Sequence, residues 1–445
     1  MRIFNTYSNR LEEFVPLKKN EVSIYVCGPT VYNYIHIGNA RPVVFFDVVR
    51  RYFEHKGYKV KFASNFTDVD DKIIAKAQSE GKTEKEISEK YIEQTMKDIE
   101  ALGSKTDFIK PKVTEYMPFI IDYIAKLVNL GNAYIIDGDV YFSVESIPDY
   151  GRLSNRKLDD MKSGARIEVN DKKKNPLDFT LWKKTDVGVR WDSPFSVGRP
   201  GWHTECVAMI DDIFGGEIDI HGGGNDLIFP HHENEIAQAE ALHHNHIARY
   251  WMHNGLLNME DEKMSKSAGS IVQVRDIHDK AMPFRMLLLS TYYRSPLNYS
   301  ADNLAAYVAE WDKIVGTTNI LNRTLALGKD DDAVNPDREK EIQGLMDDFD
   351  QAMDQDFNTP NALTALRALI KETNIELRRK NNHRLLKQID GVMKRMFAIL
   401  GLDPKIREIT EEDKDLYRQW ETFRKEGKYA EADKIRSVLQ DRKLL

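Results

Sequence analysis

Hydrophobic and polar positions along the first part of the chain follow a strand, helix, strand order. A short apolar run at 22–26 ends in a Cys-Gly-Pro turn, as a strand does at its exit. Apolar residues then recur at spacings near four across 38–58, which predicts a helix with one buried face. A second apolar run follows at 60–63. This order is typical of a right-handed parallel crossover and predicts a Rossmann-type sheet.

The pattern changes between about residues 115 and 196. Two alternating runs flank Asp137 and Gly138, and an Asp-Gly pair in that position predicts a hairpin. The parallel pattern returns at 218–221 and is followed by a predicted helix at about 231–242. We interpret the middle segment as an insertion that splits the sheet.

Every element predicted after about residue 282 is a helix. Thr359 and Pro360 predict a helix start, with threonine as the cap and proline at the first helical position. Apolar residues within 432–439 predict a last short helix. The expected fold class is therefore α/β, with a doubly wound parallel sheet split by an insertion and followed by an all-α C-terminal region.

Charge limits how the chain can contact nucleic acid. Its 445 residues, too many for one ordinary domain, include 64 Lys and Arg against 71 Asp and Glu, for a net charge of −7. A general basic surface is excluded, so contacts with nucleic acid must come from local patches. Two segments supply an excess of positive charge: 152–190, with eleven basic and six acidic residues, and 371–395, with eight and three.

Cysteine content and apolar runs indicate the compartment. Only Cys27 and Cys206 occur, which excludes a disulfide scaffold of the secreted type. The first nineteen residues mix charge and polarity where a secretory leader would be apolar. The longer apolar runs fall far short of the ~20 residues needed to span a bilayer. We expect a cytoplasmic protein with reduced thiols.

Two motifs have residue types suited to phosphate binding. His36-Ile37-Gly38-Asn39 begins the first predicted helix, where a phosphate would meet free backbone amides and the positive helix end. Lys263 and Lys266 lie in a stretch of small polar residues, where they could act as point charges on a polyphosphate. A helix-entry turn and a solvated loop are the plain structural alternatives.

Two further motifs suit small-molecule binding. Asp226 follows three glycines, including Gly223, at the edge where parallel sheets bind nucleotides, and its carboxylate suits ribose hydroxyls. Trp202 could form the wall of a small-molecule pocket. A plain tight turn and core packing are the respective alternatives.

A metal site is one interpretation of the remaining residues. His231 and Glu235 are four apart on a predicted helix, so both side chains project from one face and could bind a metal. A surface hydrogen bond is the alternative. Cys27 and Cys206 are 179 positions apart, so the fold would have to bring them together.

Taken together and in this order, the motifs resemble those of the cysteinyl-tRNA synthetases, a family of class I aminoacyl-tRNA synthetases. The resemblance extends from Arg2 to about Leu439. The segments that carry it read YVCGPTVY at 25–32, HIGNAR at 36–41, TDVDDK at 67–72, GRPGWH at 198–203, FPHHENE at 229–235, KMSKS at 263–267 and DFNTP at 356–360.

The resemblance implies a site for each substrate of the reaction. A zinc ion would read the thiol of the substrate cysteine and reject serine without an editing domain. ATP, accompanied by Mg²⁺, would react with cysteine to give an adenylate. The implied zinc ligands are Cys27, Cys206, His231 and Glu235; the catalytic residues are His36, Asn39, Lys263 and Lys266; the ATP-binding residues are His36, Gly38, Asn39, Gly223, Asp226 and Lys266; and the cysteine-binding residues are Gly28, Thr67 and Trp202.

The resemblance also implies the partners and the division of the chain. The partners are L-cysteine, ATP and tRNA(Cys), with no membrane, and the protein is expected to be a monomer. The implied parts are two halves of a Rossmann catalytic domain at 1–115 and 197–255, an insertion at 116–196, a KMSKS and stem-contact region at 256–300, a helical tRNA-binding bundle at 301–404 and a small anticodon-binding domain at 405–445. Relatives commonly continue into a Gly-Thr-x-Trp ending, so anticodon reading is expected to be built differently here or the chain to be shortened.

Two other functions share part of this pattern. A cysteine ligase of the mycothiol pathway would have the same catalytic half but would attach cysteine to an amino sugar. The helical segment after 299 and the basic stretch at 371–395 favour tRNA instead. A non-catalytic RNA-binding relative would have no use for two phosphate-handling motifs. Cysteine-dependent exchange of pyrophosphate into ATP separates these alternatives.

Overall fold

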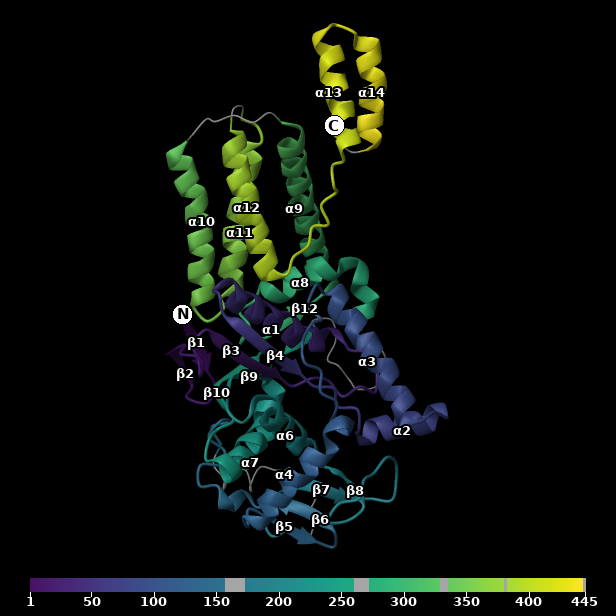
Figure 1. The fold of residues 1–445 in the computed structure, drawn as a ribbon, viewed down its shortest axis with the longest axis vertical. Helices are drawn as coiled ribbons and strands as arrows, with labels where there is room; N and C mark the ends of the chain where they lie inside the picture. The colour runs from purple at the N-terminus through teal and green to yellow at the C-terminus, as the bar shows by residue number, and fades with distance from the viewer. Residues whose placement is uncertain (157–172, 260–271, 329–334, 380–381, 443–445) are drawn as a thin grey trace. The chain divides into compact units, whose positions relative to one another are not determined.

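Figure 1 shows the fold of the protein in a computed structural model. The structure describes residues 1–156, 173–259, 272–328, 335–379 and 382–442. The chain divides into two compact units, each described here by itself. Unit 1 comprises Met1–Ala281, Thr291–Ser300 and Asp354–Phe357, and unit 2 comprises Met282–Ser290, Ala301–Met353 and Asn358–Leu445.

A parallel four-stranded sheet is the centre of unit 1, in the order β10-β9-β3-β4. Its strands are mostly apolar because helices cover parallel sheets. The carboxyl ends of all four strands meet at one edge, which confirms the predicted Rossmann-type sheet. The strands are β3 (Glu21–Val26), β4 (Lys59–Ser64), β9 (Ile218–Gly224) and β10 (Ala248–Asn254).

The predicted crossover helix is α1 (Ile37–His55), which links β3 to β4. Val44, Val48 and Phe53 are fully buried on its inner face. Burying such side chains contributes roughly 1.5–3 kcal/mol each, so packing against the sheet stabilises the helix far more than propensity does. The other long helices in the described part of unit 1 are α2 (Asp71–Glu80), α3 (Glu84–Ala101), α4 (Met117–Asn129), α6 (Trp202–Phe214) and α7 (Glu233–His243).

The insertion between β4 and β9 forms its own antiparallel sheet in the order β5-β6-β7-β8. The predicted Asp-Gly hairpin joins β5 to β6, with φ of 55° at Asp137 and 94° at Gly138. Positive φ at both central residues matches the turn that suits the twist of a hairpin. The strands are β5 (Ala133–Ile136), β6 (Asp139–Phe142), β7 (Phe179–Lys184) and β8 (Gly198–Pro200).

Two small strand pairs complete the sheets that the described residues of unit 1 form. An antiparallel pair lies at the start of the chain and packs beside β10. A parallel pair joins the segment after β10 to the segment after α8 (Ala281–Leu289). Their bounds are Arg2–Asn5 (β1), Arg10–Glu13 (β2), Leu257–Met259 (β11) and Leu297–Tyr299 (β12).

The described part of unit 2 is helical, as predicted. Its α11 packs against α9 and α12, and α13 packs against α14. The cap of α11 differs from the prediction: the Asn358 side chain accepts from the Asn361 N–H, whereas Thr359 is the first helical residue and donates to the Leu289 carbonyl. The helices are α9 (Ala301–Leu327), α10 (Pro336–Asp354), α11 (Thr359–Glu376), α12 (His383–Leu400), α13 (Glu411–Lys425) and α14 (Tyr429–Asp441).

Candidate active site

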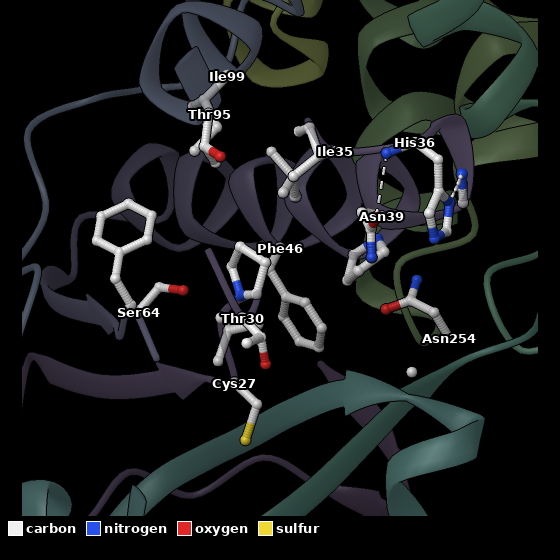
Figure 2. Close-up of a pocket in the computed structure, with 18 of the residues that line it drawn as sticks. Cys27, Thr30, Ile35, His36, Asn39, Phe46, Ser64, Thr95, Ile99 and Asn254 are labelled. Atoms are coloured by element: carbon white, nitrogen blue, oxygen red, sulfur yellow. Dashed lines mark hydrogen bonds between the residues drawn. The ribbon is translucent and has the colours of Figure 1, made fainter. Parts of the chain in front are cut away.

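A cavity of about 540 Å³ opens at the carboxyl edge of the parallel sheet. Figure 2 shows residues from three elements around it: Cys27 directly after β3, His36 and Asn39 at the start of α1, and Asn254 at the end of β10. Small-molecule sites commonly have volumes of about 300–1,000 Å³. Both the size and the position are those of a ligand site in an open parallel sheet.

Side chains at the start of α1 accept hydrogen bonds from the backbone N–H groups there. His36 Nδ1 accepts from the Gly38 N–H at 3.1 Å, and Asn39 Oδ1 accepts from the His36 N–H at 3.1 Å. The Ile37 N–H donates to the Val272 carbonyl, and the Asn39 N–H to the His36 carbonyl. The expectation of free amides at this helix start is therefore wrong. The donors left for a ligand are the side-chain nitrogens His36 Nε2 and Asn39 Nδ2.

The protonation of His36 follows from its surroundings. Burial lowers the pKa of His36, although the charge of Asp226 opposes the shift. The ring is therefore neutral near pH 7, and because Nδ1 accepts from Gly38, the proton is on Nε2. A Cβ on Gly38 would lie 2.9 Å from this ring, so a larger residue would displace it. Gly38 thus serves the placement of His36.

Gly28 lies so close to a neighbouring backbone segment that only glycine fits there. Its N–H donates to Asn65 Oδ1 at 2.8 Å, and an added Cβ would lie 1.7 Å from the Asn65 carbonyl oxygen. Asn65 Nδ2 donates to Thr67 Oγ1, and Thr67 donates to Glu205 Oε2 at 3.1 Å. The side chain of Thr67 is buried and does not line the cavity. Thr67 therefore lies one layer behind Gly28 and not in the pocket wall itself.

The four residues of the implied metal site lie together although they come from distant segments. Their ligand atoms are all within 4.8 Å of one another. Cys27 Sγ is 3.6 Å from Cys206 Sγ and 3.9 Å from Glu235 Oε1, and His231 Nε2 is 3.0 Å from Glu235 Oε1. The fold thus brings the two distant cysteines into contact.

The local structure at His231 differs from the prediction. The predicted helix begins at Glu233, and His231 lies in the π-helical turn Ile228–His232 that precedes it. The turn continues into α7, so the ring still reaches Glu235. The pairing was therefore predicted correctly from spacing, whereas the helix boundary was not.

The two sulfurs of the cluster differ in charge. The Cys27 thiol donates to Cys206, which lowers the pKa of Cys206 to about 6. Burial and the neighbouring Cys206 raise the pKa of Cys27. Burial opposes the charged form of His231, but Glu235 and Cys206 raise its pKa to about 10. A cluster that is already anionic at one sulfur is suited to a cation.

A second possible ligand set overlaps the first. Cys27 and Glu235 could also be joined by His221 and His232, and the Cys27 Sγ to His232 Nε2 distance is 3.3 Å. His232 Nδ1 lies 2.8 Å from His253 Nε2, so this ring is already held by its neighbour. The first set contains two cysteines and the second set contains one. Because zinc prefers thiolate ligands, the first set suits zinc better.

Trp202 and Asp226 both line the cavity. The Trp202 ring is 43% exposed and stacks on His231 with centroids 4.3 Å apart, so it is not a core residue. Asp226 is exposed in the turn that follows β9 and Gly223. Lys263 and Lys266 lie outside the described residues.

Several polar residues of the site were missed by sequence reasoning. Asn254 is 1% exposed, and neither atom of its amide has a hydrogen-bond partner among the described residues. Asn65 and Glu205 form the layer behind Gly28, and His203 Nδ1 lies 3.2 Å from His231 Nδ1. The one available signal was position, because Asn254 ends a strand at the carboxyl edge.

Two family profiles match the chain. The profile for the catalytic domain of class I (C) tRNA synthetases matches residues 13–309, and the DALR domain profile matches 348–403. Among solved structures, methionyl-tRNA synthetase of Mycobacterium tuberculosis in complex with methionyl-adenylate has a TM-score of 0.64 at 14% identity, covering 89% of this chain and 93% of that one. Fold and site thus define a class I aminoacyl-tRNA synthetase.

Curated relatives narrow the class. The Cysteine–tRNA ligase of Carboxydothermus hydrogenoformans is 45% identical over 450 residues, covering 99% of this chain and 96% of the relative. The Cysteine–tRNA ligase of Bacillus cytotoxicus is 45% identical over 450 residues, covering 100% and 97%. The chain belongs to the cysteine–tRNA ligase family.

Proposed function

We propose that this member of the family activates L-cysteine with ATP and Mg²⁺ and transfers the cysteinyl group to the 3′-terminal ribose of tRNA(Cys). The observation that carries the proposal is the cluster of Cys27, Cys206, His231 and Glu235 at the cavity. Neither step needs a protein nucleophile, because the cysteine carboxylate and a ribose hydroxyl attack in turn. The protein's contribution is alignment and charge stabilisation.

The residues of the cluster fit a zinc ion. Zinc with thiolates at about 2.3 Å in a tetrahedron would set two sulfurs about 3.8 Å apart. The sulfurs of Cys27 and Cys206 are 3.6 Å apart without any rearrangement. His231 Nε2 lies 3.0 Å from Glu235 Oε1, and Glu235 Oε2 lies 2.7 Å from His221 Nε2, so both donor groups are buried and held in place. A soft donor pair with one nitrogen and one carboxylate is a set that zinc accepts.

Zinc held there would favour the deprotonated thiol of the substrate over the serine hydroxyl. Cys27 lines the cavity, so the cluster is open to a ligand on that side. Trp202 covers His231 on the same side and would pack against the substrate. Gly28, held by Asn65, sets the wall beside Cys27. Selection against serine then comes from the pocket itself, without an editing domain.

The residues at the start of α1 are suited to the phosphates. His36 Nε2 and Asn39 Nδ2 are neutral donors and would bind phosphate oxygens of ATP, while Gly38 keeps the His36 ring in place. Lys263 and Lys266 would supply the positive charge that these donors lack. We assign both pairs to stabilising the charge that develops at the α-phosphate.

The nucleoside would lie over the end of β9. Asp226 would accept hydrogen bonds from the ribose hydroxyls. Gly223 has no side chain that could block the end of the strand. Asn254 lies beside this strand end, since it pairs in register with Gly224. Its unpartnered amide can both donate and accept, which is the pattern that an adenine edge requires.

Unit 2 would bind the tRNA. The DALR match and the basic stretch at 371–395 support this assignment. The protein would act as a cytoplasmic monomer, with the six parts predicted from the sequence. Among the described residues, no helix is long and apolar enough to cross a bilayer. Because the net charge is −7, contacts with tRNA must come from local basic stretches, and tRNA affinity should be salt-sensitive.

Exchange of labelled pyrophosphate into ATP tests the proposal. We expect exchange with cysteine, none above background with serine, and about one zinc per chain by emission spectrometry. Transfer is then measured with tRNA(Cys) and with an amino-sugar inositol as acceptors. Transfer to the amino sugar alone would favour the mycothiol-type ligase. Absence of exchange with an intact metal site would favour the RNA-binding module.

A further inference from the structure

The cavity has an arm that leads away from the carboxyl edge of the sheet. Its lining includes Asp47 and Arg50, about three turns along α1 from Ile37. At about 1.5 Å per helical residue, the cavity follows α1 for roughly 15–20 Å. It also reaches Phe62, in the middle of β4, whereas nucleotides in parallel sheets bind beyond the strand ends. This arm therefore extends past the space that the substrates require.

The arm lies between α1, β4, α3 and the segment 104–108, and is called the α1–α3 arm below. The segment that follows α3 runs along β4, with Ser64 N–H donating to the Ile109 carbonyl and Ile109 N–H to the Phe62 carbonyl. This pairing closes the outer edge of the sheet, so the arm has a floor as well as two helical walls. Its side chains are mainly aromatic and aliphatic: Val43, Phe46, Phe62, Phe66, Ile99 and Phe108.

One polar side chain in this apolar lining has no partner. Thr95 is 1% exposed, and its Oγ1 makes no hydrogen bond to any described residue. Figure 2 shows the Thr95 hydroxyl on the side toward Ile35. Leaving a buried hydroxyl without a hydrogen-bond partner is unfavourable. A ligand with one hydrogen-bonding group would remove that cost.

The missing bond at Thr95 is unusual for a threonine within a helix. Such hydroxyls normally bond back to the carbonyl four residues earlier. Thr317, Thr318 and Thr373 do so here at 2.7–3.0 Å, donating to the carbonyls of their own helices. Thr95 has the same option on α3 but does not take it. Its hydroxyl is thus left available for a ligand.

Charges at the far end of the α1–α3 arm are already paired. Arg50 donates to Glu54 at 3.0 Å and lies 3.1 Å from an Asp107 carboxylate oxygen. Lys105 also binds Glu54. Asp47 accepts from Arg51 at 2.8 Å. A charged ligand would have to break one of these pairs, so a neutral one is favoured.

We propose that the α1–α3 arm is a second small-molecule site, which takes a neutral bicyclic aromatic compound with one N–H or O–H group. The aromatic walls bind its rings, and Thr95 Oγ1 accepts its single donor. The site adjoins the ATP pocket but is separate from it. The proposal does not depend on which amino acid the enzyme activates.

Indole and its hydrocarbon analogue indene test this proposal as probes. Binding to the full-length protein is followed by saturation-transfer NMR in the absence and presence of saturating ATP and Mg²⁺. We expect indole to bind wild type, more tightly than indene, with ATP causing no displacement. Displacement of indole by ATP would place the probe in the nucleotide pocket and overturn the proposal, as would absence of binding at millimolar concentration.

Two substitutions locate the probe. Thr95→Val has the same shape without the hydroxyl, so it should weaken indole binding about tenfold and change indene binding less than twofold. Ile99→Phe fills the arm and should abolish binding of both probes. Cysteine-dependent pyrophosphate exchange, which should persist in both variants, reports that each has folded. Unchanged indole binding in both variants would show that the probe binds outside the arm and would overturn the proposal.

Discussion

Two buried polar clusters, one in each unit, are built in opposite ways. In unit 1, Glu235 lies 3.0 Å from His231 Nε2 and 2.7 Å from His221 Nε2, and its ligand atoms lie within 4.8 Å of those of Cys27, Cys206 and His231. In unit 2, Glu376 is 1% exposed and accepts from both Arg338 and Arg379. Two thiols, an imidazole and a carboxylate form a donor set that zinc accepts, whereas the guanidinium groups around Glu376 bind no metal and only neutralise it. The types of donor that are gathered, and not burial or charge alone, therefore distinguish a site from a scaffold.

The largest expected effect comes from removing a sulfur from the unit 1 cluster. Cys206→Ser should lose bound zinc and lower cysteine-dependent pyrophosphate exchange by about three orders of magnitude, because the interaction that selects the substrate is lost. Emission spectrometry and the exchange assay measure the two losses on the same sample. A variant that is fully active without zinc would end the metal assignment.

Three further variants separate the metal from the scaffold. Ala208→Ser adds a hydroxyl to the same buried stretch of α6 without removing a ligand, and should retain zinc and activity. His231→Asn should lose zinc, and His221→Asn should retain it. The reverse result for the two histidines would show that zinc is held by the overlapping set that contains His221 and His232.

The second largest effect is expected from removing a positive charge assigned to the ATP phosphates and not to the substrate thiol. Lys266→Ala should lower the rate of adenylate formation by a factor on the order of 10²–10³, because charge stabilisation at the phosphates is lost. Zinc content and cysteine binding should stay close to wild type. Single-turnover kinetics and calorimetry measure the rate and the binding. Lys280→Ala, an exposed lysine in the described segment after the motif, is the matched control. Equal losses in both variants would point to general electrostatics.

A smaller effect is expected one layer behind the pocket. Thr67→Val should raise the KM for cysteine about tenfold and leave the KM for ATP within twofold, because Asn65 and Glu205 lose the hydroxyl that joins them. Thr67→Ser keeps that hydroxyl and should restore the wild-type KM. If the serine variant has the raised KM and the valine variant does not, the methyl packing of Thr67 and not its hydrogen bonds sets the position of Gly28.

The sequence predicted the parts of the site whose spacing or order is local. The crossover from β3 through α1 to β4, the Asp-Gly hairpin and the helices of unit 2 follow from apolar periodicity and turn residues. The pairing of His231 with Glu235 follows from a spacing of four, even though the helix begins two residues later. Periodicity predicts which face of a helix is buried. The π-helical turn and α7 present His231 and Glu235 on the same face, so the pairing survives the shift of the helix boundary.

Other features depend on contacts between segments far apart in sequence. The 3.6 Å approach of Cys27 to Cys206 spans 179 positions, and only the resemblance to a family predicted it. Nothing local shows that His36 uses its ring to cap α1 and so occupies an amide expected to be free. Asn254 looks like any polar strand end until its amide is found buried without a partner. Such features arise from packing and are invisible to periodicity.

The smallest expected effect tests the unit 2 side of the comparison. Arg338 joins α10 to Glu372 and Glu376 of α11, and its side chain is 19% exposed. Arg338→Gln should destabilise the protein by about 1–2 kcal/mol, which lies between the values for exposed and for buried ion pairs. The loss is not larger because Arg379 still binds Glu376.

The readouts for Arg338→Gln must separate stability from chemistry. Thermal unfolding followed by circular dichroism should shift by a few degrees, and hydrogen exchange should rise in α10 and α11 alone. Cysteine-dependent pyrophosphate exchange at 25 °C should be unchanged, because no cavity residue is touched. Arg418→Gln removes a pair with Asp415 that is about two-thirds exposed on both sides, and should have no measurable effect. A large loss of exchange activity in Arg338→Gln would mean that this satisfied cluster is more than a scaffold, and would contradict the contrast drawn between the two units.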